Sequence, residues 1–228
     1  MREGGPVTQT ITFDSVRPAE AVGRDRLLLV GGILAGPLFV GSALVQGLTR
    51  DGYDFRRHPV SVLSTGDLGW IQIATFLVTG LLTIGAAWAL RRVEPGGSAW
   101  LPRLVTLYGI GLMAAGVFSA DPADGFPAGT PRGAGQISWH GGLHFLAAAL
   151  AFVALIVATV LLARRAARSG QRVRAGLSLL VGAFFAVAWV AMIVRPGPLT
   201  MIGFGLGVTA GWAWLTGTLM AAVRGSTR

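Results

Sequence analysis

Six long apolar segments constrain this chain more than any other feature. They lie at about residues 27–48, 70–90, 101–120, 138–162, 175–194 and 199–223. Each approaches or exceeds the roughly 18 to 20 residues that a helix needs to cross the hydrocarbon core of a bilayer. Because lipid cannot hydrogen-bond to the backbone, such segments cross it as helices. The segments predict an all-α fold, a polytopic membrane helix bundle with six transmembrane helices.

The composition agrees with a lipid bilayer as the surroundings of the chain. Only 13% of the 228 residues are charged, against roughly 25% in soluble domains. The 19 basic residues, all arginine, produce a net charge of +9, but most lie at the ends of apolar segments, as membrane topology requires. We find no basic and aromatic module of the usual kinds, so we expect no nucleic-acid partner. There is no cysteine, which excludes disulfide and thiolate chemistry.

The distribution of arginine predicts the orientation of the bundle. With the N-terminus inside, 14 arginines fall on the cytoplasmic side and five on the other. The positive-inside rule then places both termini in the cytoplasm. We expect a polar cytoplasmic tail at 1–26, the membrane domain at 27–223 and a short cytoplasmic tail at 224–228.

Small and polar side chains at helical spacing predict which helix faces pack together. The small residues are Gly32 and Gly36 in the first segment and Gly203, Gly207 and Gly211 in the last. The polar residues are Gln72, Thr75, Thr79 and Thr83 in the second segment. Small residues let helix backbones approach closely in membranes, and polar side chains hydrogen-bond across the interface. We expect these faces to contact other helices.

Two polar loops, 49–69 and 121–137, are predicted to meet at the extracytoplasmic face. His58 lies in the first, and His140 and His144 lie one helical turn apart after the second, on one face of the fourth segment. The helix N-terminus and burial both favour neutral imidazoles there, able to act as ligand or base.

Asp121 ends the third segment, where a carboxylate is electrostatically unfavourable and needs a cationic partner. The candidate partners are a metal ion, a protonated histidine or Arg195. His58, His140, His144 and Asp121 together suit Zn²⁺ with an open position for water. Such water can hydrolyse an amide or ester of a lipid. Two alternatives stay open: the histidines hold the loops together, or Asp121 or His140 donates a proton without a metal.

Four further residues are candidates for substrate binding. Asp124, Ser61 and Ser64 are expected near the site, although the two serines also suit a short helical turn after Pro59. Arg195 is suited to a lipid phosphate, or marks the membrane interface. Ser138 is predicted to cap the fourth helix.

A run of residues in the first polar loop resembles a known family. It reads Gly52-Tyr53-Asp54-x-x-x-His58-Pro59-x-Ser61-x-Leu63-Ser64-x-Gly66-x-x-Gly69-Trp70-x-Gln72. With Asp121-Pro122 and the His-x-x-x-His pair, it resembles the bacterial and archaeal membrane-protein family of domain of unknown function 998, over 27–223. The resemblance implies a six-span protein of the bacterial cytoplasmic membrane and no established reaction. The chain is also loosely similar to alkaline ceramidases and progestin-adiponectin receptors, zinc-containing proteins of seven spans whose histidines are distributed differently.

Three functions follow from these features. The first is a membrane-embedded enzyme acting on a lipid or isoprenoid-like substrate at the outer leaflet, with His58, Asp121, His140 and His144 in its site. The second is a non-catalytic membrane subunit or lipid-binding protein with structural polar loops, with a membrane-protein partner or a second copy of itself. The third is a small transporter, which the absence of charged residues in the middle of the segments disfavours.

Overall fold

The structure, a computed structural model, describes residues 19–93 and 99–225. Its helices are α1 (Ala19–Thr49), the 3₁₀ helix η1 (Val60–Ser64), α2 (Gly69–Val93), α3 (Trp100–Val117), α4 (Trp139–Arg168), α5 (Arg172–Val194) and α6 (Pro198–Gly225). All six α-helices are long and apolar enough to cross a membrane. The described residues form no strand, so the predicted all-α architecture is confirmed.

Several helix boundaries differ from the predicted ones. The first helix begins at Ala19, so the polar residues 19–26 extend it, while 1–18 of the predicted tail lie outside the described residues. The third helix ends at Val117, which leaves Asp121 in the following loop instead of at the helix end. The fourth continues to Arg168, because arginine side chains favour the negative end of the helix dipole.

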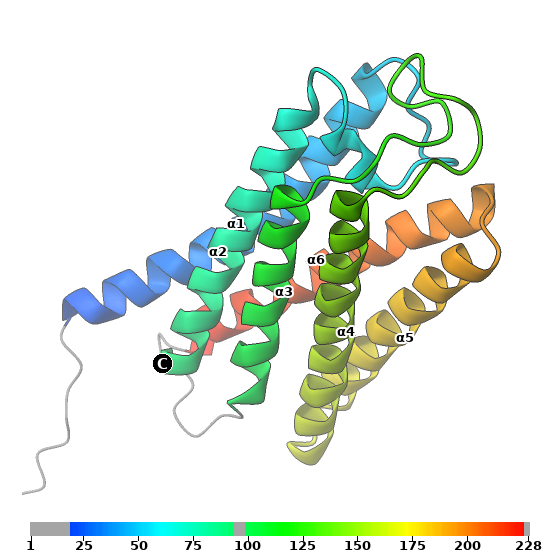
Figure 1. Ribbon diagram of the computed structural model, residues 1–228. Coiled ribbons are helices and arrows are strands. Elements are labelled where there is room, and N and C mark those ends of the chain that lie inside the picture. Colours follow the sequence, from blue (N-terminus) through cyan, green and yellow to red (C-terminus); the bar gives the residue numbers. More distant parts are fainter. Residues whose placement is uncertain (1–18, 94–98, 226–228) are drawn as a thin grey trace, which may run out of the picture.

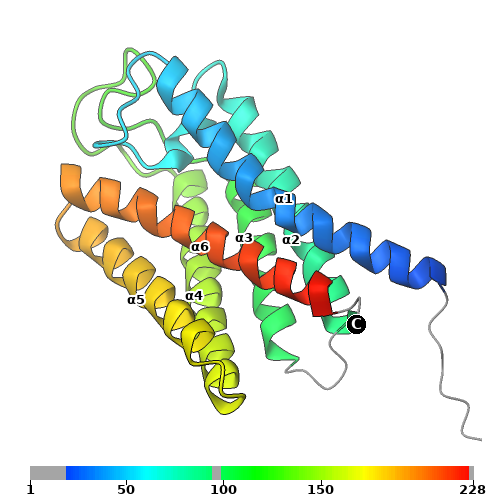
Figure 2. The same cartoon turned by 180° about the vertical axis from the view of Figure 1, so that it is seen from behind.

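The helices form a ring in chain order. Each helix packs against the next, and α6 packs against α1 to close the ring. Figure 1 shows α3 and α4 side by side, with α6 crossing behind them and α1 crossing behind α2. We call the end that holds residues 50–68 and 118–138 the histidine end, and the opposite end the arginine end. In the view from behind, α1 and α6 diverge towards the histidine end (Figure 2).

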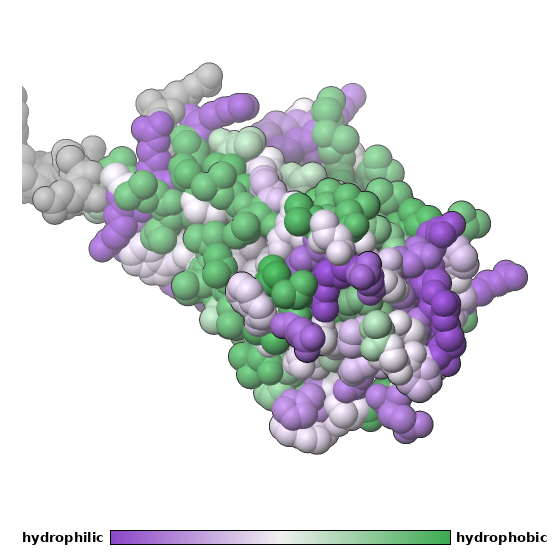
Figure 3. Space-filling model, turned by 90° about the horizontal axis from the view of Figure 1, so that it is seen from above, coloured by the Kyte–Doolittle hydropathy of each residue, from purple (hydrophilic) through white to green (hydrophobic). Residues whose placement is uncertain are grey.

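The surface separates into a polar end and apolar flanks. Seen from the histidine end, hydrophilic residues gather at the centre and the right of the view, and hydrophobic surface lies to their left and above them (Figure 3). Leu48 and Leu199 are 78% and 85% exposed. Exposed apolar surface on this scale marks contact with a protein or a membrane. On helices of this length and hydropathy it faces lipid.

The close helix packing predicted for the first segment is confirmed. A Cβ atom added to Gly32 would collide with Ala86 of α2 and lie 2.8 Å from Leu219 Cδ1 of α6. One added to Gly36 would lie 2.8 Å from Thr216 Oγ1 of α6. The two glycines therefore let α1 fit between both of its neighbours.

The glycine ridge of the last helix packs along two of its three predicted positions. A Cβ atom on Gly207 would lie 3.1 Å from Phe185, and one on Gly211 would lie 2.9 Å from Leu155. Gly203 has nothing within 4 Å of its ideal Cβ position. Of the three predicted glycines, Gly207 and Gly211 therefore lie on the packing face of α6, and Gly203 does not.

The polar stripe of α2 faces inwards, as predicted. All four side chains of the stripe are buried. Gln46 Nε2 of α1 donates to Gln72 Oε1 at 2.9 Å, and the hydroxyls of Ser42 and Thr75 lie 2.8 Å apart. These hydrogen bonds join α1 to α2 near the histidine end.

Replacing Gly32 with leucine should destabilise the bundle. The added side chain would overpack the junction of α1 with α2 and α6, which typically costs about 1–3 kcal/mol. We expect a lower thermal unfolding temperature in detergent. Gly41→Leu, on the same helix with nothing within 4 Å of its Cβ position, is the matched control. Equal unfolding temperatures for the two variants would contradict this account of the packing.

Candidate functional site

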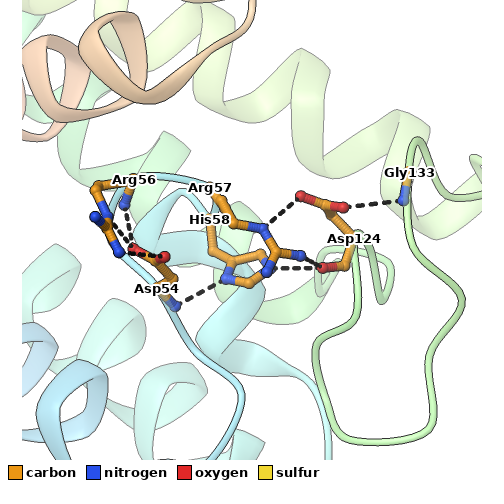
Figure 4. A network of polar contacts seen from close by, with 6 residues as sticks. All are labelled: Asp54, Arg56, Arg57, His58, Asp124 and Gly133. Carbon is orange, nitrogen blue, oxygen red and sulfur yellow. Dashed lines mark hydrogen bonds and ion pairs between the residues drawn. The ribbon is translucent and has the colours of Figure 1, made fainter.

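Asp124 is the centre of the contact between the two loops of the histidine end. Arg57 Nε donates to Asp124 Oδ2 at 3.0 Å, and Arg57 Nη2 donates to the Asp124 carbonyl. The Gly133 amide donates to Asp124 Oδ1 at 2.9 Å (Figure 4). A residue of the second loop is thus bound by the first loop and by its own loop.

Both ring nitrogens of His58 form hydrogen bonds, one within the first loop and one to the second loop. Nδ1 accepts a hydrogen bond from the Asp54 amide at 3.0 Å. The proton therefore resides on Nε2, which donates to the Asp124 carbonyl oxygen at 3.1 Å. The side chain is 2% exposed. Neither nitrogen is left to bind a metal, so in this geometry His58 holds the two loops together.

Arg50 fastens η1 to the second loop. Its guanidinium donates to the carbonyl oxygens of Leu63 and Thr65, each at 2.5 Å. It also lies 4.8 Å from the ring centroid of Phe126, a favourable cation–π distance. The Phe126 ring is buried against Val62 and Leu63. Charge, hydrogen bonds and apolar burial therefore act together to hold η1 against the second loop.

Each of the two carboxyl groups in these contacts has an arginine as its charge partner. The hydrogen bond from Arg57, and next that from the Gly133 amide, hold the pKa of Asp124 below its usual value. The side chain of Arg56 likewise lowers the pKa of Asp54. Both groups are stabilised as anions.

Asp121 binds the start of α4. Its carboxylate accepts from the Ser138 amide and from the Ser138 hydroxyl, both at 2.7 Å. Ser138 Oγ in turn accepts from the Gly141 amide at 3.1 Å, which confirms the predicted N-cap. The carboxylate thus lies at the positive end of a helix dipole. A helix N-terminus provides the electropositive partner that the sequence led us to seek in a metal, a histidine or Arg195.

His140 and His144 have different surroundings although one turn separates them. His144 is 2% exposed. Its Nδ1 faces the carbonyl oxygens of Ala115 at 3.0 Å and Phe118 at 2.9 Å, so Nδ1 carries the proton and donates to both. These are carbonyls that the end of α3 leaves without helical partners. His140 is exposed, with its ring 3.5 Å from that of Trp139. The expectation of burial is wrong for His140.

The predicted zinc ligands do not form a cluster. In residues 19–93 and 99–225, no group of three or more histidine, aspartate or glutamate side chains is placed to hold a metal ion. His58, His144 and Asp121 each bind backbone or capping groups, and His140 lies at the surface. The zinc site stays a prediction that this geometry does not support.

Of the predicted substrate-binding residues, Ser61 and Ser64 lie on η1, Asp124 lies in the loop contact and Arg195 lies between α5 and α6. Ser64 Oγ donates to the Ser61 carbonyl at 2.7 Å and accepts from the Ala120 amide at 3.2 Å. The predicted helical turn after Pro59 is confirmed as η1. Arg195 is exposed between α5 and α6.

A cavity beneath the loops is the feature that sequence reasoning missed. It has a volume of about 490 Å³ and is lined by residues of α1, η1 and α2 to α6, mostly apolar. Phe39, Phe76, Phe152 and Trp189 lie on its walls, and the polar residues on them are His58, Ser61, Tyr108, His144 and Thr209. No described lining residue carries a formal charge. The small residues Ala148, Ala149 and Gly205 line the cavity and leave room for it. They are the one feature of the sequence that indicates it.

The fold and its apolar flanks define a multi-pass integral membrane protein. The chain matches the model of a family described as protein of unknown function (DUF998) over residues 33–221, and it belongs to this family. Comparison with curated proteins and with solved structures finds no match.

Gly141→Ala should weaken the start of α4. A Cβ atom at this position would collide with the Asp121 carboxylate and displace it from Ser138. Loss of a cap costs about 1 kcal/mol, which we expect as a lower thermal unfolding temperature. Gly142→Ala, with nothing within 4 Å, is the neighbouring control. A Gly141→Ala protein as stable as the control would show that the Asp121 contact is dispensable.

Asp124 should make the loop contact sensitive to acid. Because folding lowers the pKa of Asp124, its stabilisation is complete above the pKa of the unfolded side chain. The stabilisation is lost as the pH falls through the lowered pKa of the folded state. We expect hydrogen exchange at residues 50–68, corrected for the intrinsic effect of pH, to accelerate in that acidic range.

Asp124→Asn separates this charge from other acidic groups. Asn suits the left-handed backbone at this position, where φ is 48°. The variant should exchange faster at neutral pH and lose the part of the acid response that Asp124 contributes. Asp54→Asn, which breaks an ion pair within one loop, is the control. An unchanged acid response in Asp124→Asn would assign that response to another group.

Proposed function

We propose that this protein is a non-catalytic lipid-binding protein of the membrane, which holds a lipid or isoprenoid chain in the cavity at its histidine end. The carrying observation is the cavity itself, about 490 Å³ with walls that are almost entirely apolar. Pockets for small ligands measure roughly 300–1,000 Å³ and combine apolar walls with a few polar groups. A flexible hydrocarbon chain matches such a lining.

The position of the cavity supports entry from the bilayer. Leu44 of α1 and Leu206 of α6 both line the cavity, and they are 48% and 56% exposed on the lipid-facing surface. The two helices diverge towards this end (Figure 2). A chain from the surrounding lipid can therefore enter between α1 and α6 without crossing water.

The loops support a structural role over a catalytic one. His58, Asp121 and Asp124 already bind loop and helix-end groups. His58, Pro59 and Ser61 line the cavity at the same time. In this proposal the contact between the two loops holds η1 in place. η1 covers the cavity at the histidine end, and we call it the roof of the cavity.

The arginine count supports the orientation. Fourteen arginines lie on the predicted cytoplasmic side, including Arg91 and Arg92 in the last turn of α2 and Arg165 and Arg168 in that of α4. The positive-inside rule then places the histidine end outside. The ligand in this proposal comes from the outer leaflet.

Filling the cavity should abolish lipid binding. Gly205 of α6 lines the cavity and has nothing within 4 Å of its Cβ position, so Gly205→Leu places a side chain in the space without a backbone clash. We expect native mass spectrometry of the protein released from membranes to show a bound lipid in the wild type and none in this variant. Gly203→Leu, also free within 4 Å and outside the cavity lining, should keep the lipid. Equal lipid occupancy in all three proteins would overturn the proposal.

A further inference from the structure

We infer that the bound lipid ends in an uncharged hydroxyl group, which His144 and Ser61 hold, so that the ligand class is a long-chain or isoprenoid alcohol. This inference rests on the proposed function and adds the chemistry of the ligand's polar end. It is drawn from the polar groups on the cavity wall that protein partners leave unused.

The cavity walls disfavour a charged headgroup. No arginine, aspartate or glutamate is among its described lining residues. The nearby guanidinium groups of Arg50 and Arg57 are engaged by loop carbonyls and by Asp124. Burying a phosphate or carboxylate without a partner is costly. The ligand's polar end is therefore neutral.

His144 provides a hydrogen-bond acceptor. Nδ1 carries a proton because it faces two carbonyl oxygens, those of Ala115 and Phe118. Nε2 makes no hydrogen bond within the described ranges, and the residue lines the cavity. Among apolar walls the ring is favoured in its neutral form, so Nε2 presents a lone pair. A ligand satisfies it by donating a hydrogen bond.

Ser61 provides the complementary donor. The Ser61 carbonyl accepts from Ser64, but its own hydroxyl has no hydrogen-bond partner among the residues that the structure describes. Ser61 lies on η1 and lines the same cavity as His144. An alcohol both donates and accepts, so one hydroxyl group can donate to His144 Nε2 and accept from the Ser61 hydroxyl.

Tyr108 marks the deep end of the cavity. Its hydroxyl also lacks a hydrogen-bond partner in the described chain, but it lies seven residues before Ala115 on α3, about 10 Å along the helix axis. Its ring packs edge-on against Trp212 at 5.3 Å. With the hydroxyl of the ligand at His144, the apolar chain extends towards Tyr108.

A series of ligands that differ only at the polar end tests this inference. The probes are a C20 isoprenoid alcohol, its methyl ether and its monophosphate, added to the delipidated protein and compared by native mass spectrometry. The ether keeps the acceptor but lacks the donor. A buried hydrogen bond implies about five- to tenfold tighter binding of the alcohol than of the ether. We expect the monophosphate to bind less tightly than the alcohol.

His144→Asn removes the acceptor at the position of Nε2 while keeping the donor that holds α3. The asparagine side-chain nitrogen occupies the place of Nδ1 and can still donate to Ala115 and Phe118. Its amide oxygen takes the place of the ring carbon Cδ2, nearer the backbone, so no acceptor remains at the position of Nε2. We expect this variant to keep its fold by circular dichroism and to bind the alcohol no better than the ether. Ser61→Ala should weaken the binding of alcohol and ether alike, because both accept from the serine hydroxyl, and Tyr108→Phe should leave the preference unchanged.

The outcomes separate this inference from the proposed function. Equal binding of all three probes, or tighter binding of the monophosphate, would overturn the hydroxyl site and leave lipid binding standing. A preference for the alcohol that survives His144→Asn, or that Tyr108→Phe removes, would also overturn it. Binding of none of the probes, and of no lipid from membranes, would overturn both.

Discussion

The structure depends on hydrogen bonds to the backbone amide and carbonyl groups that lie where the helices end at the membrane surface. Helix ends leave amide and carbonyl groups without partners, and these are costly to bury unpaired. At the histidine end, polar side chains satisfy them. His144 donates to two carbonyls at the end of α3, Asp121 and Ser138 accept from the start of α4, and Arg50 donates to two carbonyls around η1. Residue types that serve as catalytic groups in many enzymes thus complete the backbone hydrogen bonding here.

This use of the polar residues connects the loops to the cavity. The contact of Arg57 and His58 with Asp124 fixes the first loop against the second. Since His58 and Ser61 also line the cavity, the same contact sets the shape of the cavity's roof. The one nitrogen of His144 that the end of α3 does not use is available to a ligand. Structural and binding roles therefore meet in single side chains.

The sequence predicted the helices well, because hydropathy and caps are local. The six apolar segments, the Ser138 cap and the inward polar stripe from Gln72 to Thr83 are all present. The sequence did not predict the partners of the loop residues. Asp121 binds Ser138, 17 positions away, and His58 binds Asp124, 66 positions away, so both pairs depend on how the loops pack. The cavity depends on the relative placement of seven helical elements, and small residues such as Gly205 indicate it only weakly.

The central claim is that the cavity holds a lipid chain with its polar end at the roof. A crystal structure of the protein grown from a lipidic mesophase tests this most directly. The account predicts elongated electron density that enters between α1 and α6 and ends within hydrogen-bond distance of His144 Nε2 and Ser61. Density for ordered water alone, or side chains collapsed into the space, would contradict it.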